Sequence, residues 1–338
     1  MKLIRTLCAS ATLAMCIGTP AHSAVMFHFN YNDASGVGFN DLSVGADRQN
    51  TLQSAGDYIS TFLTSYTANI FMDVDGSTSG GGTLAAAGSN YNIPDADGFG
   101  NMGDVQRKIL GGDAADPNAG AADGTITWNF TDFLWELGTD FQAGEFDFFS
   151  TAVHEILHAM GFVSFIEEVG SSNTGNKAWS PFDNFIGDST GDLISDTTLA
   201  LDEARWDIAS VAGQDGGVGA PFGCGRGLLF NGANAVAANG GNPLEIYSPN
   251  PWEGGSSGSH LDDQCYTVDG AVSTYMMEAQ TVDGLGRRTI SPVEVGVFRD
   301  IGYSQFGVTA TNDVPEPAII YLLTAGLLIL GVRRRKYS

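Results

Sequence analysis

The segment His154-Glu155-Ile156-Leu157-His158-Ala159-Met160-Gly161-Phe162 is the most informative stretch of this chain of 338 residues. Its two histidines are four residues apart, so on an α-helix both side chains project from one face, about one turn apart. Two imidazoles in this arrangement can bind one zinc ion, and the glutamate between them can act on water at the open coordination position. The segment therefore predicts a helix that carries a hydrolytic metal site.

Residue types on either side define this helix and its surroundings. Asp147 is a typical N-cap residue, and Gly161 can adopt the left-handed backbone that ends many helices. Hydrophobic periodicity upstream predicts a strand, an amphipathic helix, a second strand and a half-exposed edge strand, at residues 25–30, 47–66, 69–74 and 125–130. This mixture of helices and strands predicts an α+β fold.

The N-terminal segment 1–24 is typical of a secretory signal peptide, because basic residues, an apolar run and small residues follow one another in that order. Cys8 and Cys16 would be removed with it, so the exported chain would keep only Cys224 and Cys265. An oxidising compartment permits a disulfide between these two cysteines, and the alternative is a pair of free buried thiols.

The C-terminal segment 314–338 has three parts: Pro-Glu-Pro at 315–317, an apolar run at 318–332 and basic residues at 333–336. At about 1.5 Å per residue, the apolar run is shorter than the roughly 30 Å of a bilayer core, which favours a transient anchor. The segment resembles the PEP-CTERM sorting signals of Gram-negative bacteria, which a membrane protease called an exosortase cuts. This resemblance implies export to the cell envelope surface or the extracellular matrix, with transient anchoring in the inner membrane. A simple C-terminal membrane anchor is the alternative.

The chain is strongly acidic, with 39 Asp and Glu residues, 15 Lys and Arg residues and a formal net charge of −24. Nucleic acid is therefore a poor partner, because its phosphates would be repelled. Asp-rich turns at 73–75, 95–97 and 188–192 could bind calcium, although none has the spacing of an EF-hand loop. Asp-Gly turns alone would also explain them.

A catalytic zinc ion needs three protein ligands and one open position for water, so a third ligand must come from outside the motif. Of the five histidines in the chain, His22 lies in the predicted signal peptide, which leaves His28 and His260. A carboxylate could serve instead, and the candidates are Glu167, Glu168 and Glu203. Residue types alone leave the third ligand open among these side chains.

Downstream segments carry a resemblance to a known family. Ser164 stands three residues after Gly161, where compact metzincin motifs place their third histidine. The Gly-Ser-His sequence at 258–260 and the Met-containing segment 273–279 match the distant third ligand and the Met-turn of leishmanolysin-like metzincins. Ser-Pro-Val-Glu at 291–294 predicts the capped start of a helix soon after that turn. The chain thus resembles a bacterial leishmanolysin-like protease with a PEP-CTERM tail.

The resemblance implies a two-lobed, zincin-like metalloprotease domain over residues 25–313. Its upper lobe, about 25–161, would hold a mixed sheet and the active-site helix. Its lower lobe, about 162–305, would be irregular, with a Met-turn and a C-terminal helix. Such lobes bind an extended substrate along an edge strand, and we expect that edge near Trp128. Met277, rather than its neighbour Met276, is expected to lie beneath the metal.

The predicted function is a secreted or surface-sorted zinc endopeptidase that cleaves proteins or peptides. Glu155 is the predicted general base for a water molecule activated by one zinc ion. The predicted ligands are His154, His158 and His260. The alternative is a catalytically inactive matrix or binding protein on a metalloprotease scaffold, and a weaker one is a zinc hydrolase that acts on a non-peptide bond.

Overall fold

The computed structural model describes residues 25–308, apart from 77–80, 94, 119, 173–176, 214–223, 225 and 267–274. The predicted signal peptide, the PEP-CTERM-like tail and the start of the Met-containing segment lie outside the described residues. Within the described ranges, no helix is both long enough and apolar enough to cross a membrane.

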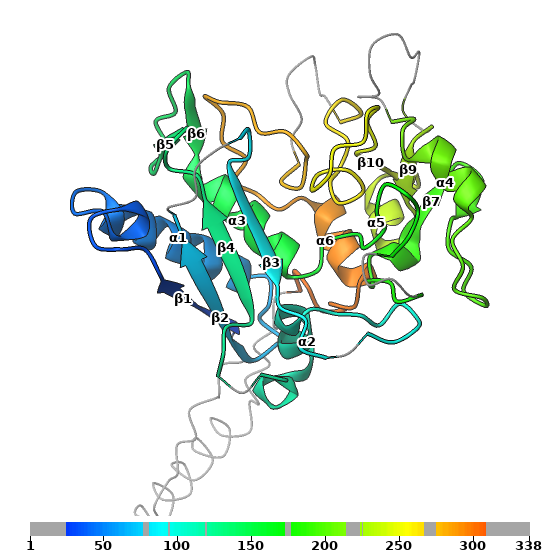
Figure 1. Cartoon of the computed structure of the whole chain (residues 1–338), viewed down its shortest axis with the longest axis horizontal. Helices are drawn as coiled ribbons and strands as arrows, with labels where there is room; N and C mark the ends of the chain where they lie inside the picture. Colours follow the sequence, from blue (N-terminus) through cyan, green and yellow to red (C-terminus); the bar gives the residue numbers. More distant parts are fainter. Residues whose placement is uncertain are drawn as a thin grey trace, which may run out of the picture.

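The described chain has an α+β architecture, as the sequence predicts (Figure 1). Its strands are β1 Val25–Tyr31, β2 Ala68–Asp75, β3 Ala85–Ser89, β4 Gly124–Trp128, β5 Leu134–Glu136, β6 Glu145–Asp147, β7 Ile186–Asp188, β8 Gly191–Asp192, β9 Leu228–Phe230 and β10 Leu244–Ile246. Its α-helices are α1 Gly45–Ser60, α2 Asp104–Gly111, α3 Phe148–Ala159, α4 Glu203–Ala209, α5 Ala233–Ala238 and α6 Pro292–Asp300.

The first sheet has the strand order β1-β2-β4-β3. The strands β1, β2 and β4 are parallel, and β3 runs antiparallel to β4. Side chains alternate between the two faces of a strand, and one face here is buried against α1 and α3. Phe27, Ile70 and Ile126 on this face are at most 3% exposed. The predicted first strand, helix and second strand are thus confirmed, although α1 ends at Ser60, six residues before the predicted end.

The strand predicted at 125–130 is confirmed as β4, but its expected position at the edge is wrong, because β4 lies inside the sheet between β2 and β3. The alternation in β4 instead reflects its two faces: Ile126 and Trp128 are buried, whereas Thr125 and Thr127 are on the open face. The edge strands are β1 and, next to β4, β3. The β3 sequence Ala-Ala-Ala-Gly-Ser has little of the β-branched and aromatic character that marks strands. This composition explains why the sequence did not indicate a strand there.

The C-terminal half, expected to be irregular, contains a second four-stranded sheet. It has the order β10-β9-β7-β8, and all its pairs are antiparallel. Each strand has only two or three residues, which is too short for a periodic sequence signal. This sheet and the helices α4, α5 and α6 lie beside the first sheet and α3 in Figure 1.

Both predicted ends of the motif helix α3 are confirmed, and so is the predicted start of α6 after the Met-containing segment. The Asp147 side chain accepts a hydrogen bond from the Phe149 backbone N–H, so it caps α3. Gly161 has a φ of +107°, which favours glycine, just after the helix. Ser291 and Glu294 form a reciprocal capping box at the start of α6, with Pro292 in its first turn.

Cys224 and Cys265 form a disulfide, with their Cα atoms 5.7 Å apart. Cys224 lies shortly before β9, and Cys265 lies five residues after His260. The sequence left a pair of free thiols open as the alternative, and the structure excludes it. The disulfide therefore restrains the part of the chain that carries the predicted third ligand.

Replacing both Cys224 and Cys265 by serine should lower the free energy of unfolding by about 2–4 kcal/mol. The two cysteines are 41 residues apart in sequence, so their bond removes much conformational freedom from the unfolded chain. Urea unfolding of the double variant beside the wild type measures the difference. An unchanged free energy of unfolding would contradict a stabilising role.

Candidate metal centre

Three histidines converge at one point between α3 and the C-terminal half of the chain. His154 and His158 lie on α3, and His260 lies on the loop after β10. The Nε2 atoms are 3.0 Å apart for His154 and His158, 3.1 Å for His154 and His260, and 2.9 Å for His158 and His260. The structure thus brings together the three histidines that the sequence and the family resemblance predict as metal ligands.

The opposite ring nitrogen of each histidine is held by a backbone carbonyl. The Nδ1 atom of His154 donates to the carbonyl of Met276, that of His158 to Phe162 and that of His260 to Ser256, each at 2.7 Å. A carbonyl oxygen can only accept, so each Nδ1 carries the proton of a neutral imidazole. All three Nε2 atoms are therefore left as acceptors, with their lone pairs directed at one another.

This arrangement fits a metal cation and is unfavourable without one. Burial lowers the pKa of His154 to about 4 and that of His260 to about 3, so protons do not occupy the site at neutral pH. An ion at the usual zinc–nitrogen distance of about 2.0–2.1 Å from each Nε2 can sit over a triangle of this size. Three neutral imidazoles suit zinc and other transition metals, and they leave a coordination position open.

Backbone pairing brings His260 to α3. The His260 carbonyl accepts the N–H of Tyr247, directly after β10, at 2.8 Å. On the other side, the N–H of Ser164 donates to the Ser259 hydroxyl at 3.0 Å. Ser164, which stands where compact metzincin motifs carry their third histidine, thus contacts the loop that carries His260.

Glu155 lies beside this site, on the turn of α3 between the two motif histidines. Its side chain is 6% exposed, and burial raises its pKa to about 8, while a hydrogen bond from the Ala87 backbone acts in the opposite direction. Ala87 belongs to β3, so the predicted general base contacts the edge strand of the first sheet. A cation at the histidines would favour the charged carboxylate.

The free edge of β3 faces the site. Hydrogen-bonded and non-bonded residue pairs alternate along an antiparallel ladder. The bonds from Asn129 to Leu84 and from Asn90 to Asp123 fix this alternation at both ends of β3. The backbone groups of every second residue between them therefore point away from β4, and these residues are Ala85, Ala87 and Ser89. The hydrogen bond between Ala87 and Glu155 agrees with this register.

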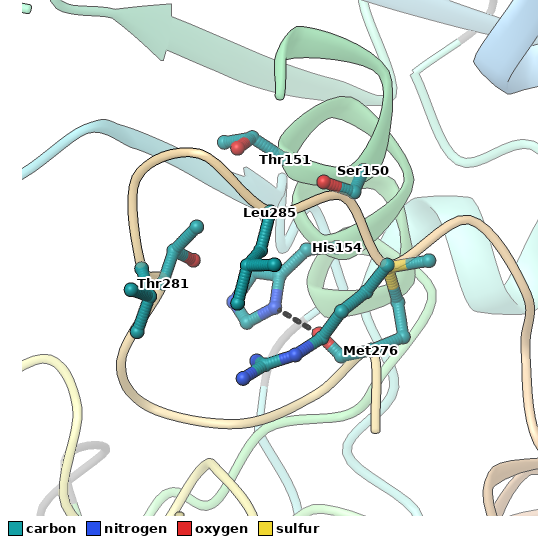
Figure 2. Close-up of a pocket in the computed structure, with 8 residues that line it drawn as sticks. Ser150, Thr151, His154, Met276, Thr281 and Leu285 are labelled. Carbon is teal, nitrogen blue, oxygen red and sulfur yellow. Dashed lines mark hydrogen bonds between the residues drawn. The ribbon is translucent and has the colours of Figure 1, made fainter. Parts of the chain in front are cut away.

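A pocket adjoins the ring of His154, between the first turns of α3 and the chain that follows the Met-containing segment (Figure 2). The residues that line it are Ser150, Thr151, His154, Met276, Thr281, Val282, Leu285 and Arg287. Arg288 keeps this wall in place, because its Nε donates to the Asp147 carboxylate at 2.8 Å. Residue types along the wall carry no periodic signal, so the sequence did not reveal the pocket.

The other candidate ligands lie elsewhere. The His28 ring stacks on Phe71, with 4.8 Å between the ring centroids, and its Nε2 is 3.2 Å from the Asn69 amide oxygen. The three carboxylates considered as alternatives are exposed and outside the histidine group, and they are Glu167, Glu168 and Glu203. Of the candidate third ligands that the sequence left open, His260 is the one whose side chain lies beside His154 and His158.

Calcium gains no support at the predicted Asp-rich turns. Asp188 forms an ion pair with Arg205, and Asp73 accepts a hydrogen bond from the Asn30 amide at 2.9 Å. Within the described parts of the chain, the histidine group alone brings together three or more metal-ligating side chains. The predicted turn at 73–75 is wrong, because these residues end strand β2 and the Asp73 bond joins paired residues of β1 and β2. Asp188 does lie in a turn, where it also accepts the backbone N–H of Thr190 at 2.7 Å.

No protein-family model matches the chain, and no related sequence was found among curated proteins. A functional interpretation therefore depends on the motif and on the geometry of the site.

Replacing His260 by alanine should weaken zinc binding by more than about 100-fold, because even the loss of residues that support metal ligands costs about 10–100-fold. Metal analysis and chelator competition measure the change. His28→Ala is the matched control and should bind one zinc ion per chain like the wild type, since His28 is remote from the site. Full zinc affinity in His260→Ala would remove His260 from the ligand set.

The metal-free protein should lose stability in acid relative to a His260→Gln variant. The pKa of His260 is about 3 in the folded chain and 6.5 in its ordinary state, so below pH 6.5 the unfolded chain binds a proton that the folded chain excludes. Stability that is present above pH 6.5 is then lost towards pH 3, by up to about 1.4 kcal/mol per pH unit. Urea unfolding of both chelator-treated proteins tests this, and identical pH profiles would contradict it.

Proposed function

We propose that this protein is a zinc-dependent endopeptidase of the metzincin type, with His154, His158 and His260 as ligands and Glu155 as general base. The observation that carries the proposal is the convergence of three neutral Nε2 atoms beside a buried glutamate. An inactive scaffold has no need of that glutamate, since three imidazoles alone would hold a structural ion. The combination favours hydrolysis over simple metal storage.

Bound zinc would lower the pKa of a water ligand towards about 7 and polarise the scissile carbonyl. The Glu155 carboxylate would take a proton from the attacking water and later transfer it to the leaving amine. Burial raises the pKa of Glu155, whereas a bound cation would lower it, so the two effects oppose each other at the proposed base. The surrounding protein keeps bulk water from the carboxylate, which is only 6% exposed.

The substrate class in this proposal is an extended protein or peptide chain. The outward backbone groups of Ala85 and Ser89 on β3 offer main-chain pairing to such a chain, next to Glu155. The pocket beside His154 would receive one substrate side chain. In this proposal the substrate pairs with β3 rather than with the region of Trp128, which was the expected edge.

The proposal includes the two-lobed arrangement and export to the cell surface or extracellular matrix. The sheet with α3 at its side supports an upper lobe over 25–161, and the loop-borne His260 supports a lower lobe over 162–305. The disulfide supports an oxidising, extracytoplasmic compartment. An exosortase remains the proposed partner of the tail.

Replacing Glu155 by glutamine should lower casein hydrolysis by about 10²–10⁴-fold while zinc binding is kept, because the amide cannot accept the proton from water. Initial rates and metal content of the wild type and the variant measure both effects. Glu167→Gln is the matched control, since Glu167 is an exposed glutamate outside the site, and it should keep wild-type activity.

A wild type that binds zinc but cleaves no protein would instead support the inactive scaffold. Hydrolysis that survives zinc chelation, or that persists in Glu155→Gln, would also be incompatible with the proposed mechanism.

A further inference from the structure

Glu294 lies on α6 and has no part in the mechanism above, yet its side chain joins two separate pieces of backbone. The residue is fully buried. Its Oε2 accepts the N–H of Ser291 at 2.7 Å and so closes the capping box, while its Oε1 accepts the N–H of Met277 at 2.8 Å. One side chain therefore links the start of α6 to the Met276–Met277 dipeptide.

The backbone carbonyls of the same dipeptide bind the ring of one metal-site histidine and the residue next to another. The Met276 carbonyl accepts the Nδ1–H of His154 at 2.7 Å, which sets the orientation of that ring. The Met277 carbonyl accepts the N–H of Leu261, the residue after His260, also at 2.7 Å. A shift of this dipeptide would therefore move the first and the third ligand together.

Helix capping alone does not account for this carboxylate. A capping box needs only the bonds between Ser291 and Glu294, and it works at exposed helix ends. Here the second carboxylate oxygen is directed away from the helix to Met277, in a fully buried position. Burial of a carboxylate is costly unless hydrogen bonds compensate it, and no ion pair among the described residues includes Glu294.

We propose that Glu294 is a positioning residue of the metal centre, which fixes His154 and His260 through the Met276–Met277 backbone. This inference rests on the metal centre of the proposed function. Side chains that orient metal ligands from outside the coordination shell typically affect metal affinity by about 10–100-fold when they are replaced. Glu294 is one contact further from the metal than such side chains, because it binds the Met276–Met277 backbone, and the Met276 carbonyl binds the ring of His154.

The test is the zinc affinity of the full chain, measured by competition with a chromophoric chelator. Glu294→Gln keeps the size of the side chain, but its amide group cannot accept hydrogen bonds at both ends. We expect its zinc dissociation constant to rise by about 10–100-fold. The visible spectrum of the cobalt-substituted protein should change as well, because it reports ligand geometry.

Ser291→Ala is the matched control. It removes the hydroxyl that accepts the Glu294 backbone N–H at 3.2 Å, but it leaves the bond from Met277 to the carboxylate intact. It should destabilise α6, lower Tm and keep the zinc affinity within about twofold of the wild type. An equal loss of affinity in both variants would mean that Glu294 only stabilises the helix, and would overturn the inference.

Wild-type zinc affinity and cobalt spectrum in Glu294→Gln would overturn the inference as well. If Glu294→Gln does not fold, Glu294→Asp takes its place, because the shorter side chain cannot reach both backbone partners. Wild-type zinc affinity and cobalt spectrum in Glu294→Asp would then overturn the inference. Zinc binding without proteolysis in the wild type would refute the proposed endopeptidase but leave this inference standing. Proteolysis with unchanged zinc affinity in the variants would refute only the inference.

Discussion

Three imidazole nitrogens that can only accept hydrogen bonds face one another at 2.9–3.1 Å, and the site is built around this constraint. Acceptors at this distance repel each other unless a cation lies among them. Burial keeps protons away, and each ring is held in place through its Nδ1 atom. The three carbonyls that hold the rings come from three segments, so the fold must bring these segments to α3.

Backbone hydrogen bonds connect these segments to one another, and their apolar side chains Leu261, Met276 and Met277 belong to the buried core. Residues after β10 pair with the His260 loop, and that loop pairs with the Met276–Met277 dipeptide. The dipeptide is in turn bound by Glu294 at the start of α6. Beside Glu155, the backbone of Ala87 in the edge strand β3 favours the charged carboxylate. The ring of His154 is held by the dipeptide, that of His158 by the chain that continues α3, and that of His260 by its own loop.

Features set by neighbouring residues could be predicted from the sequence. The Asp147 cap, the ending at Gly161 and the capping box at 291–294 all depend on contacts within a few residues. The strand at 25–30 pairs with distant β2, but its β-branched and aromatic residues mark it as a strand in the sequence. The edge strand could not be predicted in this way. An Ala-Ala-Ala-Gly-Ser strand has no hydrophobic pattern of its own, and its place beside β4 depends on pairing with a distant segment.

The sequence by itself determined that His154 and His158 lie on one face of a helix, with Glu155 between them in sequence, because helical geometry links residues four apart. This pair is one half of the proposed metal site. The sequence left the other half open among His28, His260 and several carboxylates. His260 is 102 residues from His158, and the entropy of closing a loop depends so weakly on its length that spacing cannot select a partner. Only the tertiary structure decided this, since long-range backbone pairing places His260 at α3 and leaves His28 on the open face of the sheet.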